Sequence, residues 1–332
     1  MKEYTISEGD AGIRLDKQLL KILSNAGSGF VYRMLRKKNI TLNDKKAAGN
    51  ERLNKGDVIK LYLSDETFDR FSSGKGLDLK DISGVSRDIG DMILYEDDGL
   101  IILNKAPGLL SKKAASSDIS INEMCLSYLV NRGELTQDKL KLFKPSVCNR
   151  LDRNTSGIII FAKNHSMAAS VGNALASRTI HKYYMCLVKG CIDKEDRVRS
   201  YLLKDENKNL VKIYEEDGPG RSLIETAYRP ISYKDGVTLL EVDLITGKSH
   251  QIRAQMAALD HPLAGDVKYG DKALNDLFKK KYSLKAQALH AYKLEIPGDI
   301  EGPLSYLAGR TFTAPPYGIM KEVINDIFDM YD

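Results

Sequence analysis

The stretch VCNRLDRNTSGIIIFAKN, residues 147–164, sets a single carboxylate directly before a short apolar run. Asp152 starts the pattern D-x-N-x-S-G, which supplies the first oxygen ligands and the glycine turn of a calcium-binding loop. Such a loop also needs a glutamate at its twelfth position, which is Lys163 here. The apolar run after Gly157 is rich in β-branched residues, so it predicts a buried strand and not the helix that would follow a calcium loop. We therefore expect no calcium at Asp152.

The composition is that of a soluble globular protein. The chain has 332 residues, of which 42% are hydrophobic and 29% charged, so it is long enough for one large domain and one small domain. No apolar run approaches the roughly 20 residues of a transmembrane helix, and the start, MKEYTISEGD, lacks the apolar core of a signal peptide. The four cysteines and five histidines show none of the spacings of a metal site. We expect a cytoplasmic protein with reduced thiols, no membrane contact and no metal.

Positive charge is concentrated near the N-terminus. Residues 11–60 hold twelve Lys and Arg against four Asp and Glu, a balance of +8, whereas the whole chain has a net charge of +5. Apolar spacing predicts helices over 14–23 and 28–39, and strands before a turn at 43–44 and over 56–63. Such a module could present its cations to an RNA backbone; a merely solvated charged surface is the alternative. The predicted RNA-binding cations are Arg14, Lys17, Arg33, Arg36, Lys37 and Lys38 in this module and Lys248 further along the chain.

The rest of the chain divides into segments that differ in composition and in predicted secondary structure. Residues 65–90 mix Ser, Gly and charges without a stable period, which predicts a linker. Beyond residue 91, hairpin-like strands are interrupted by a few helices, which indicates an α+β fold on a large, mostly antiparallel or mixed sheet. We expect a small α+β domain over 1–64, the large domain over 91–318 and a C-terminal tail over 319–332. A hairpin is predicted over 93–108, further strands at 156–163, 182–190, 226–233, 236–246 and 288–296, and helices at 121–133, 165–177 and 249–259.

A phosphate-binding motif, TGKS at 246–249, is incomplete. In the P-loop pattern G-x-x-x-x-G-K-[ST] the first glycine would stand at position 242, which is Val242. One glycine cannot build the cradle of amides that binds a triphosphate. A nucleotide hydrolase is therefore a weak hypothesis, which ATP or GTP hydrolysis by the purified protein would revive.

Asp152 is the best candidate for a catalytic residue. Arg150 and Arg153 flank it, and a neighbouring guanidinium favours the ionised form of a carboxylate. An ionised aspartate can attack carbon, stabilise an oxocarbenium ion or accept a proton. For one Asp-Arg pair alone, however, a structural ion pair at the start of a strand is the better hypothesis.

Motifs elsewhere in the chain favour a catalytic role for Asp152 over a structural ion pair. NRLDRNTSG with its apolar strand, then KYYMCLVKG, then TGKSHQIRAQMAALDHPLAGDVKYG resemble the RluA family of RNA pseudouridine synthases in order and spacing. The hairpin LYEDDGLIILNKAPG and the closing segments LHAYKLEI and FTAPP extend this resemblance over most of 91–317. RLDKQL, the basic helix and GDVI, within 12–63, resemble an S-four-type RNA-binding domain, which indicates the RluC/RluD-like subset.

The resemblance implies roles for five residues of the large domain. Asp152 matches the family's catalytic aspartate, and Arg150 matches the residue that helps to displace the target base from its helix. Tyr184, more than the tyrosine before it, matches the aromatic residue that stacks on the uracil. Ile252 matches an apolar residue of the pocket, and Arg253 matches the basic residue that pairs with the aspartate.

The implied activity is the isomerisation of uridine to pseudouridine in structured RNA, by analogy large-subunit ribosomal RNA. It needs no cofactor, because the uracil is only detached, rotated and rejoined through carbon 5. Three positions depart from the family. Lys248 replaces an arginine and can still bind a phosphate, while Asn149 and Gln255 replace histidines. We expect a monomer; the alternative is an RNA-binding ribosome assembly factor with incidental catalysis.

Overall fold

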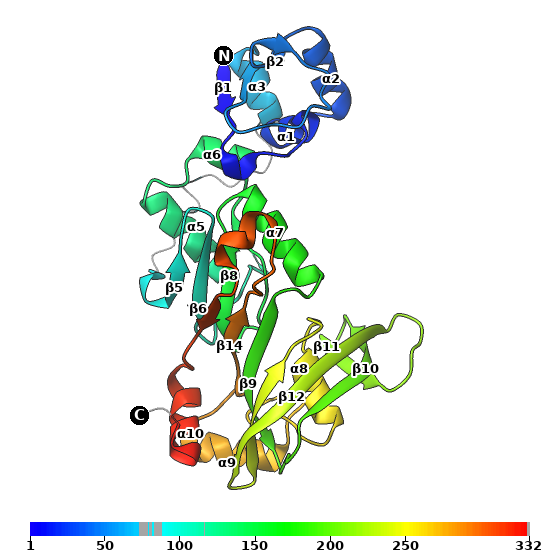
Figure 1. Cartoon of the computed structure of the whole chain (residues 1–332), viewed down its shortest axis with the longest axis vertical. Coiled ribbons are helices and arrows are strands. Elements are labelled where there is room, and N and C mark those ends of the chain that lie inside the picture. Colours follow the sequence, from blue (N-terminus) through cyan, green and yellow to red (C-terminus); the bar gives the residue numbers. More distant parts are fainter. Residues whose placement is uncertain (73–78, 80–81, 83–87, 116, 331–332) are drawn as a thin grey trace.

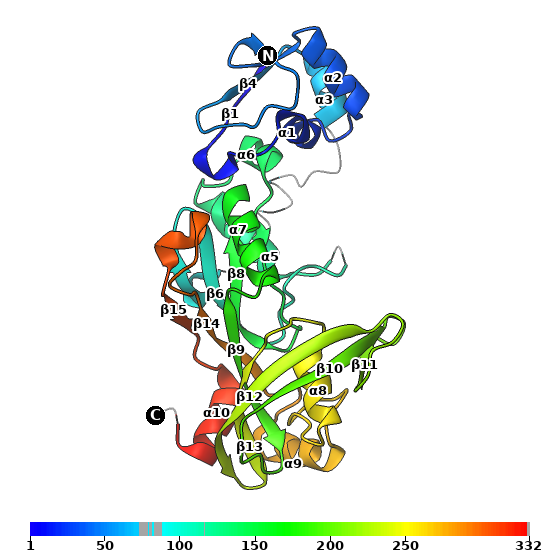
Figure 2. The same ribbon diagram turned by 45° about the vertical axis from the view of Figure 1, so that its right-hand side comes forward.

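The computed structural model describes residues 1–72, 79, 82, 88–115 and 117–330. The molecule is elongated in both views (Figure 1 and Figure 2), with a small N-terminal module at one end. The larger domain occupies the rest of the length and is built along one long sheet. Helices lie beside this sheet at several levels, and the C-terminus lies near the end opposite the N-terminal module.

The N-terminal module packs two helices on a small antiparallel sheet with strand order β1-β4-β2-β3. Leu15 and Leu19 of the first helix and Val31 and Leu35 of the second are buried in its core. The turn at 43–44 has both residues at positive φ, as a two-residue hairpin requires. The elements are β1 (Lys2–Thr5), α1 (Leu15–Ile22), α2 (Ser28–Arg36), β2 (Ile40–Leu42), β3 (Lys45–Lys46) and β4 (Val58–Leu61).

The predicted linker begins with a helix. α3 (Asp65–Ser72) buries Phe68 in the core of the N-terminal module, and the ring centroids of Phe71 and Phe30 lie 4.0 Å apart. The prediction of linker for 65–72 is therefore wrong, because the two phenylalanines give this short helix an apolar side. Of the remaining predicted linker, residues 73–78, 80–81 and 83–87 lie outside the described part of the chain.

A helix of the larger domain reaches the N-terminal module. α6 (Gln137–Leu142) places Leu142 in the core of that module. The buried side chain of Gln18 donates a hydrogen bond to the Leu142 carbonyl at 3.0 Å. The two domains therefore meet through a buried apolar and polar contact as well as through the chain that connects them.

The larger domain is built on an eleven-stranded sheet with the main order β11-β10-β12-β13-β9-β14-β8-β6-β5. Within the described residues all its strand pairs are antiparallel except β8 with β14. The predicted α+β class with a large mixed sheet is confirmed. The strands are β5 (Ile93–Glu96), β6 (Leu100–Lys105), β7 (Ser146–Val147), β8 (Ser156–Ala162), β9 (His181–Lys189), β10 (Asp196–Asp205), β11 (Leu210–Tyr214), β12 (Ser222–Lys234), β13 (Val237–Asp243), β14 (Leu289–Glu295) and β15 (Thr311–Thr313).

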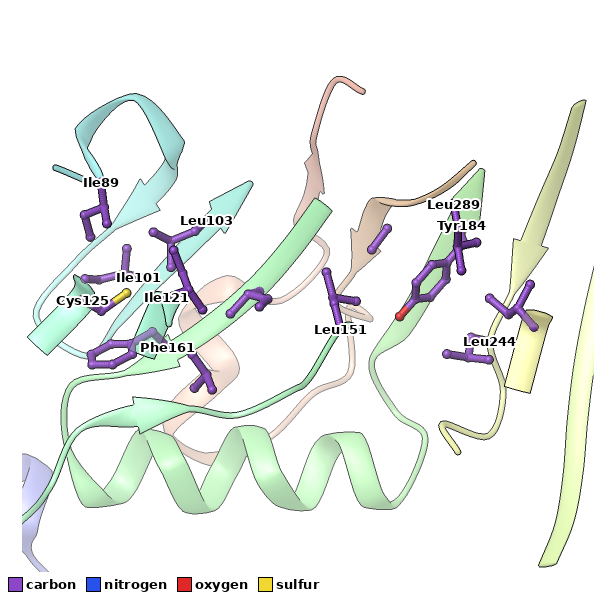
Figure 3. Packing of buried hydrophobic residues seen from close by; sticks show 14 of the residues in the cluster. Ile89, Ile101, Leu103, Ile121, Cys125, Leu151, Phe161, Tyr184, Leu244 and Leu289 are labelled. Atoms are coloured by element: carbon purple, nitrogen blue, oxygen red, sulfur yellow. The ribbon is translucent and has the colours of Figure 1, made fainter. Parts of the chain in front are cut away.

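Apolar residues bury β8 on both faces of the sheet. Ile159 and Phe161 belong to the cluster that contains α5 (Ile121–Asn131), part of which Figure 3 shows. The residues that alternate with them belong to a second cluster with α7 (His165–Ala176). Because side chains alternate along a strand, a continuous apolar run is what a strand covered on both faces requires. The strand predicted from the opening stretch is confirmed.

The parallel contact between β14 and β8 fixes the chain just after Asp152. Gly157 has a φ of 110°, and a side chain at this position would collide with the Ala291 carbonyl, so glycine is required there. One residue earlier, the Ser156 hydroxyl lies 2.8 Å from Nδ1 of the buried His290. His290 Nε2 lies 2.9 Å from the Ala314 carbonyl, which ties the closing segment to the same point.

Several elements differ from the sequence-based expectation. β10, β11 and α9 (Lys272–Tyr282) were not predicted, and α8 (Gln251–Ala258) occupies the predicted helical region. α10 (Gly318–Phe328) lies where a tail was predicted. It buries Val323 and Ile324 in a cluster with β9, β13 and α9, so the tail assignment is wrong for these residues. Residues 331–332 lie outside the described part of the chain.

Candidate active site

The residues predicted for the site come together in one cleft. A cavity of about 660 Å³ lies between the loop before β8, the start of β9 and the segment that leads into α8. All the predicted substrate-contacting residues line it, and so does Lys248. The five are Arg150, Asp152, Tyr184, Ile252 and Arg253.

Asp152 stands on a turn that is fixed on both sides. The preceding residue, Leu151, is buried, and its backbone N–H and carbonyl both bond the Ser111 hydroxyl, at 2.9 and 2.8 Å. Behind it, the Thr155 N–H donates to the Asp152 carbonyl at 3.1 Å. The carboxylate itself is 28% exposed, so it faces the cleft from a rigid base.

A guanidinium from α8 holds the Asp152 carboxylate. Arg253 Nη1 donates to Asp152 Oδ2 at 2.8 Å, and its Nε and Nη2 donate to the two oxygens of Asp266 at 2.6 and 2.9 Å. Burial opposes ionisation of Asp266, but hydrogen bonds from Arg253 and from the backbone N–H groups of Lys268 and Tyr269 outweigh it, so its pKa lies below the usual value. Arg253 is thus clamped by a buried carboxylate and aimed at Asp152.

The neighbours of Asp152 in sequence do not supply its partner. The side chains of Arg150 and Arg153 are exposed, and in the described structure neither forms an ion pair with Asp152. The expectation that these two arginines hold the carboxylate is therefore wrong. The cation that does so lies 101 residues further along the chain, where only the family resemblance had pointed.

A histidine and a tyrosine complete the wall beside Asp152. His250 Nε2 lies 3.9 Å from Asp152 Oδ2, and its Nδ1 lies 2.9 Å from the Tyr269 hydroxyl. Burial lowers the pKa of His250, although the charge of Asp152 acts in the opposite direction. The imidazole therefore favours its neutral form beside the carboxylate.

Tyr184 forms the apolar floor of the cleft. It is buried in the middle of β9, between β13 and β14, and Figure 3 shows its ring near Leu151, Leu244 and Leu289. Burial raises the pKa of its hydroxyl, as does the nearby charge of Asp152, so the phenol stays protonated. Tyr183 points to the other face of the sheet, where the Lys293 ammonium lies 3.9 Å from its ring centroid.

Two of the three departures from the family have structural roles. Asn149 donates to the Ile158 carbonyl at 3.1 Å and accepts from the Ile160 N–H at 2.8 Å, which ties the Asp152 loop to β8. Gln255 is buried and bonds Ser200, at 3.0 Å, so it holds α8 on the sheet. Lys248 is exposed at the edge of the cleft.

Asp266, His250, Tyr269 and Lys105 were not singled out from the sequence. Lys105 is fully buried, and its ammonium donates to the carbonyls of Ala106, Leu109 and Arg153 at 2.9–3.1 Å. Burial lowers its pKa to about 7, against the influence of Asp152. It thereby joins the turn after β6 to the Asp152 loop. NKAPG and GDVKYG belong to the segments that carry the family resemblance. The sequence does not show, however, that Lys105 in the first and Asp266 in the second are buried.

Of the predicted RNA-binding cations, Lys248 lines the cleft, and the other six lie on the N-terminal module. Five of the six have exposed side chains without an ion pair in the described structure. Arg14 differs, because its Nη2 lies 2.9 Å from Asp16 Oδ2, although its side chain remains 44% exposed. The five are Lys17, Arg33, Arg36, Lys37 and Lys38.

The described residues contain neither a membrane-spanning helix nor a cluster of metal ligands. No helix there is long and apolar enough to cross a lipid bilayer. No group of three or more histidines, cysteines, aspartates or glutamates lies close enough together to hold a metal ion, again within the ranges given above.

Comparison with known proteins identifies relatives along most of the chain. The family described as RNA pseudouridylate synthase matches residues 99–258. The chain is 29% identical over 297 residues to the Ribosomal large subunit pseudouridine synthase C of Vibrio cholerae, which covers 87% of each protein. It is 30% identical over 295 residues to the protein of that name from Buchnera aphidicola, covering 86% of each. The solved structure of human RNA Pseudouridylate Synthase Domain Containing 4 has the same fold, with a TM-score of 0.58, 19% identity, and 75% of this chain and 97% of that one covered.

The fold and these similarities define an enzyme of the pseudouridine synthase class. The chain belongs to the RluA family of RNA pseudouridine synthases, in its RluC/RluD-like group. It is therefore an isomerase that converts uridine in RNA to pseudouridine. The family and activity predicted from the motifs are confirmed.

Proposed function

We propose that this protein modifies uridines of large-subunit ribosomal RNA and that Asp152 is its catalytic residue. The assignment of the substrate rests on the names of the relatives. They are called ribosomal large subunit pseudouridine synthases, and they match this chain over most of its length. The catalytic role rests on one observation. Asp152 carries the only carboxylate among the described cleft-lining residues, and Arg253 holds it 2.8 Å away beside the ring of Tyr184.

The isomerisation makes simple demands on such a site. The bond from uracil N1 to the anomeric carbon breaks, the uracil rotates, its C5 joins the sugar, and the C5 proton is replaced by one on N1. Asp152 can serve as a nucleophile toward the anomeric carbon, or as the base that takes a sugar proton as the uracil leaves and returns it when C5 joins the sugar. Both routes need an ionised carboxylate in a fixed position, which Arg253 provides by two-sided pairing with Asp152 and Asp266.

The target base must leave its helix before it can reach Asp152, at a cost of a few kcal/mol. Arg150 is exposed and lines the cleft, and in this proposal its side chain occupies the gap that the base leaves. Tyr184 offers its ring to the detached uracil, and Ile252 adds an apolar wall. These contacts hold the uracil while it rotates.

The N-terminal module would supply affinity for the RNA around the target. Residues 1–64 act, in this proposal, as an S-four-type RNA-binding domain, with the five exposed cations and Arg14 on phosphates. Such contacts give salt-sensitive and largely sequence-tolerant binding. In this proposal the protein works as a monomer in the cytoplasm.

Incubation with a transcript of large-subunit ribosomal RNA tests the proposal. Carbodiimide labelling followed by primer extension should show new stops at a small number of uridines, without a change in RNA mass. A transfer RNA transcript serves as the comparison substrate. Modification of the transfer RNA alone would contradict the ribosomal assignment, and hydrolysis of ATP without any modification would contradict the chemistry.

A further inference from the structure

Most of the positively charged side chains that line the cleft have no anionic partner in the described structure. Five cations line it, against the single carboxylate of Asp152. Arg253 is satisfied by Asp152 and Asp266. For the other four side chains the described structure shows no hydrogen bond or ion pair. They are Arg150, Arg178, Lys182 and Lys248.

Lys182 is the least exposed of these four cations. It stands two residues before Tyr184 on β9, so both side chains lie on the cleft side of the strand. Its ammonium reaches the 246–249 loop, where Nζ lies 3.3 Å from the place that a Cβ of Gly247 would occupy. The glycine of the incomplete TGKS motif therefore leaves room for this ammonium, and Lys248 follows it directly on the same loop.

Partial burial of an unpaired ammonium is unfavourable. Burial lowers the pKa of Lys182, and the charge of Asp243 acts in the opposite direction. An anion bound from the cleft would stabilise the charged form at this point. A phosphodiester is the anion that an RNA substrate brings.

We propose that Lys182, with Lys248, binds a backbone phosphate beside the flipped uridine. This inference rests on the proposed function, in which Tyr184 contacts the uracil and Asp152 the sugar. Base, sugar and phosphate of one nucleotide are covalently joined, so a phosphate enters the cleft with them. Lys182 shares the strand face of Tyr184, and it projects toward a loop that carries a second cation.

Salt-dependent binding provides the test. Affinity for a large-subunit ribosomal RNA transcript would be measured at several KCl concentrations for the wild type, K182Q, K182R and the control K321Q, an exposed lysine on α10 outside the cleft. We expect K182Q to bind about tenfold more weakly at low salt. The slope of log affinity against log salt should fall by about 0.7 to 0.9, the value for one phosphate contact. K182R should keep the slope, and K321Q should match the wild type.

Single-turnover rates separate a phosphate contact from other roles. If Lys182 binds a phosphate, saturating RNA should restore most of the K182Q rate, and its melting temperature should equal or exceed that of the wild type. An unchanged slope with a lower rate at saturation would place the ammonium on the uracil and overturn the proposal, as would a K182R variant that loses as much slope as K182Q. The measurement of RNA affinity does not depend on catalysis. Loss of slope in K182Q, with a wild type that forms no pseudouridine, would support the phosphate contact and refute the proposed function.

Discussion

Asp266 holds Arg253 through two hydrogen bonds, of 2.6 and 2.9 Å, and so aims the third guanidinium N–H group at Asp152. Asp266 is fully buried, and two backbone N–H groups also fix it, so the direction of Arg253 is set by the fold. The position of the Asp152 carboxylate therefore depends on a residue that does not line the cleft.

Replacing Asp266 with asparagine should damage both stability and catalysis. The buried guanidinium would lose its charged partner, and breaking such a pair costs about 3 kcal/mol or more in the free energy of unfolding. Arg253 would then hold Asp152 less firmly, so we expect the rate of pseudouridine formation to fall at least tenfold. Urea unfolding and single-turnover rates measure the two effects. Asp260→Asn, an exposed position just after α8, is the control. Wild-type rates in the Asp266→Asn variant would contradict the positioning role.

The exposed cations of α2 and of the residue that follows it should control affinity and leave the chemistry intact. Replacing Arg33, Arg36 and Lys37 together with glutamine removes charges that have no ion-pair partner in the described structure. If at least two of them contact phosphates, the salt slope of RNA binding should fall by about 2. The rate at saturating RNA should stay near that of the wild type. Replacing three exposed lysines of α9, Lys272, Lys279 and Lys280, is the matched control. An equal loss of slope in both triple variants would contradict a specific role for the N-terminal module.

Sequence patterns predicted the elements whose signal is local. The apolar run of β8 and the amphipathic helices α1 and α2 were predicted because burial repeats along them in a regular period. β10 was missed because Arg197 and Arg199 cover its exposed side and pair with Glu225 of β12 across the sheet. α10 was taken for a tail, although its buried residues Met320, Val323, Ile324 and Ile327 recur at helical spacing in the sequence.

Much of the site could not be predicted from the sequence, because its main pairings join residues that are far apart in the chain. Nothing near Asp152 in the sequence indicates that Arg253 holds it, and the adjacent arginines suggested a wrong partner. The family resemblance supplied Arg253, Tyr184 and Ile252 as candidates, and the structure brings them into one cleft. Asp266 remained hidden, because a carboxylate in a glycine-flanked turn is most often exposed.

Acid should destabilise the fold through His290. Burial lowers its pKa to about 4, against about 6.5 in the unfolded chain. Between these values the unfolded state binds more protons, so stability falls as the pH drops from about 6.5 to 4, by up to about 3 kcal/mol. Urea unfolding at several pH values measures this slope. His290→Asn should be less stable at neutral pH but flatter below pH 6.5. His261→Asn, which removes a ring near the surface, should keep the wild-type slope. A His290→Asn variant with the full acid slope would contradict the assignment.

Asp152→Asn tests the central claim most directly. The change keeps the shape of the side chain and leaves Arg253 paired with Asp266, so the melting temperature and RNA affinity should stay close to those of the wild type. Carbodiimide mapping of a large-subunit ribosomal RNA transcript should then show none of the stops that the wild-type protein produces. The same stops at the wild-type rate with Asp152→Asn would contradict the catalytic role of Asp152.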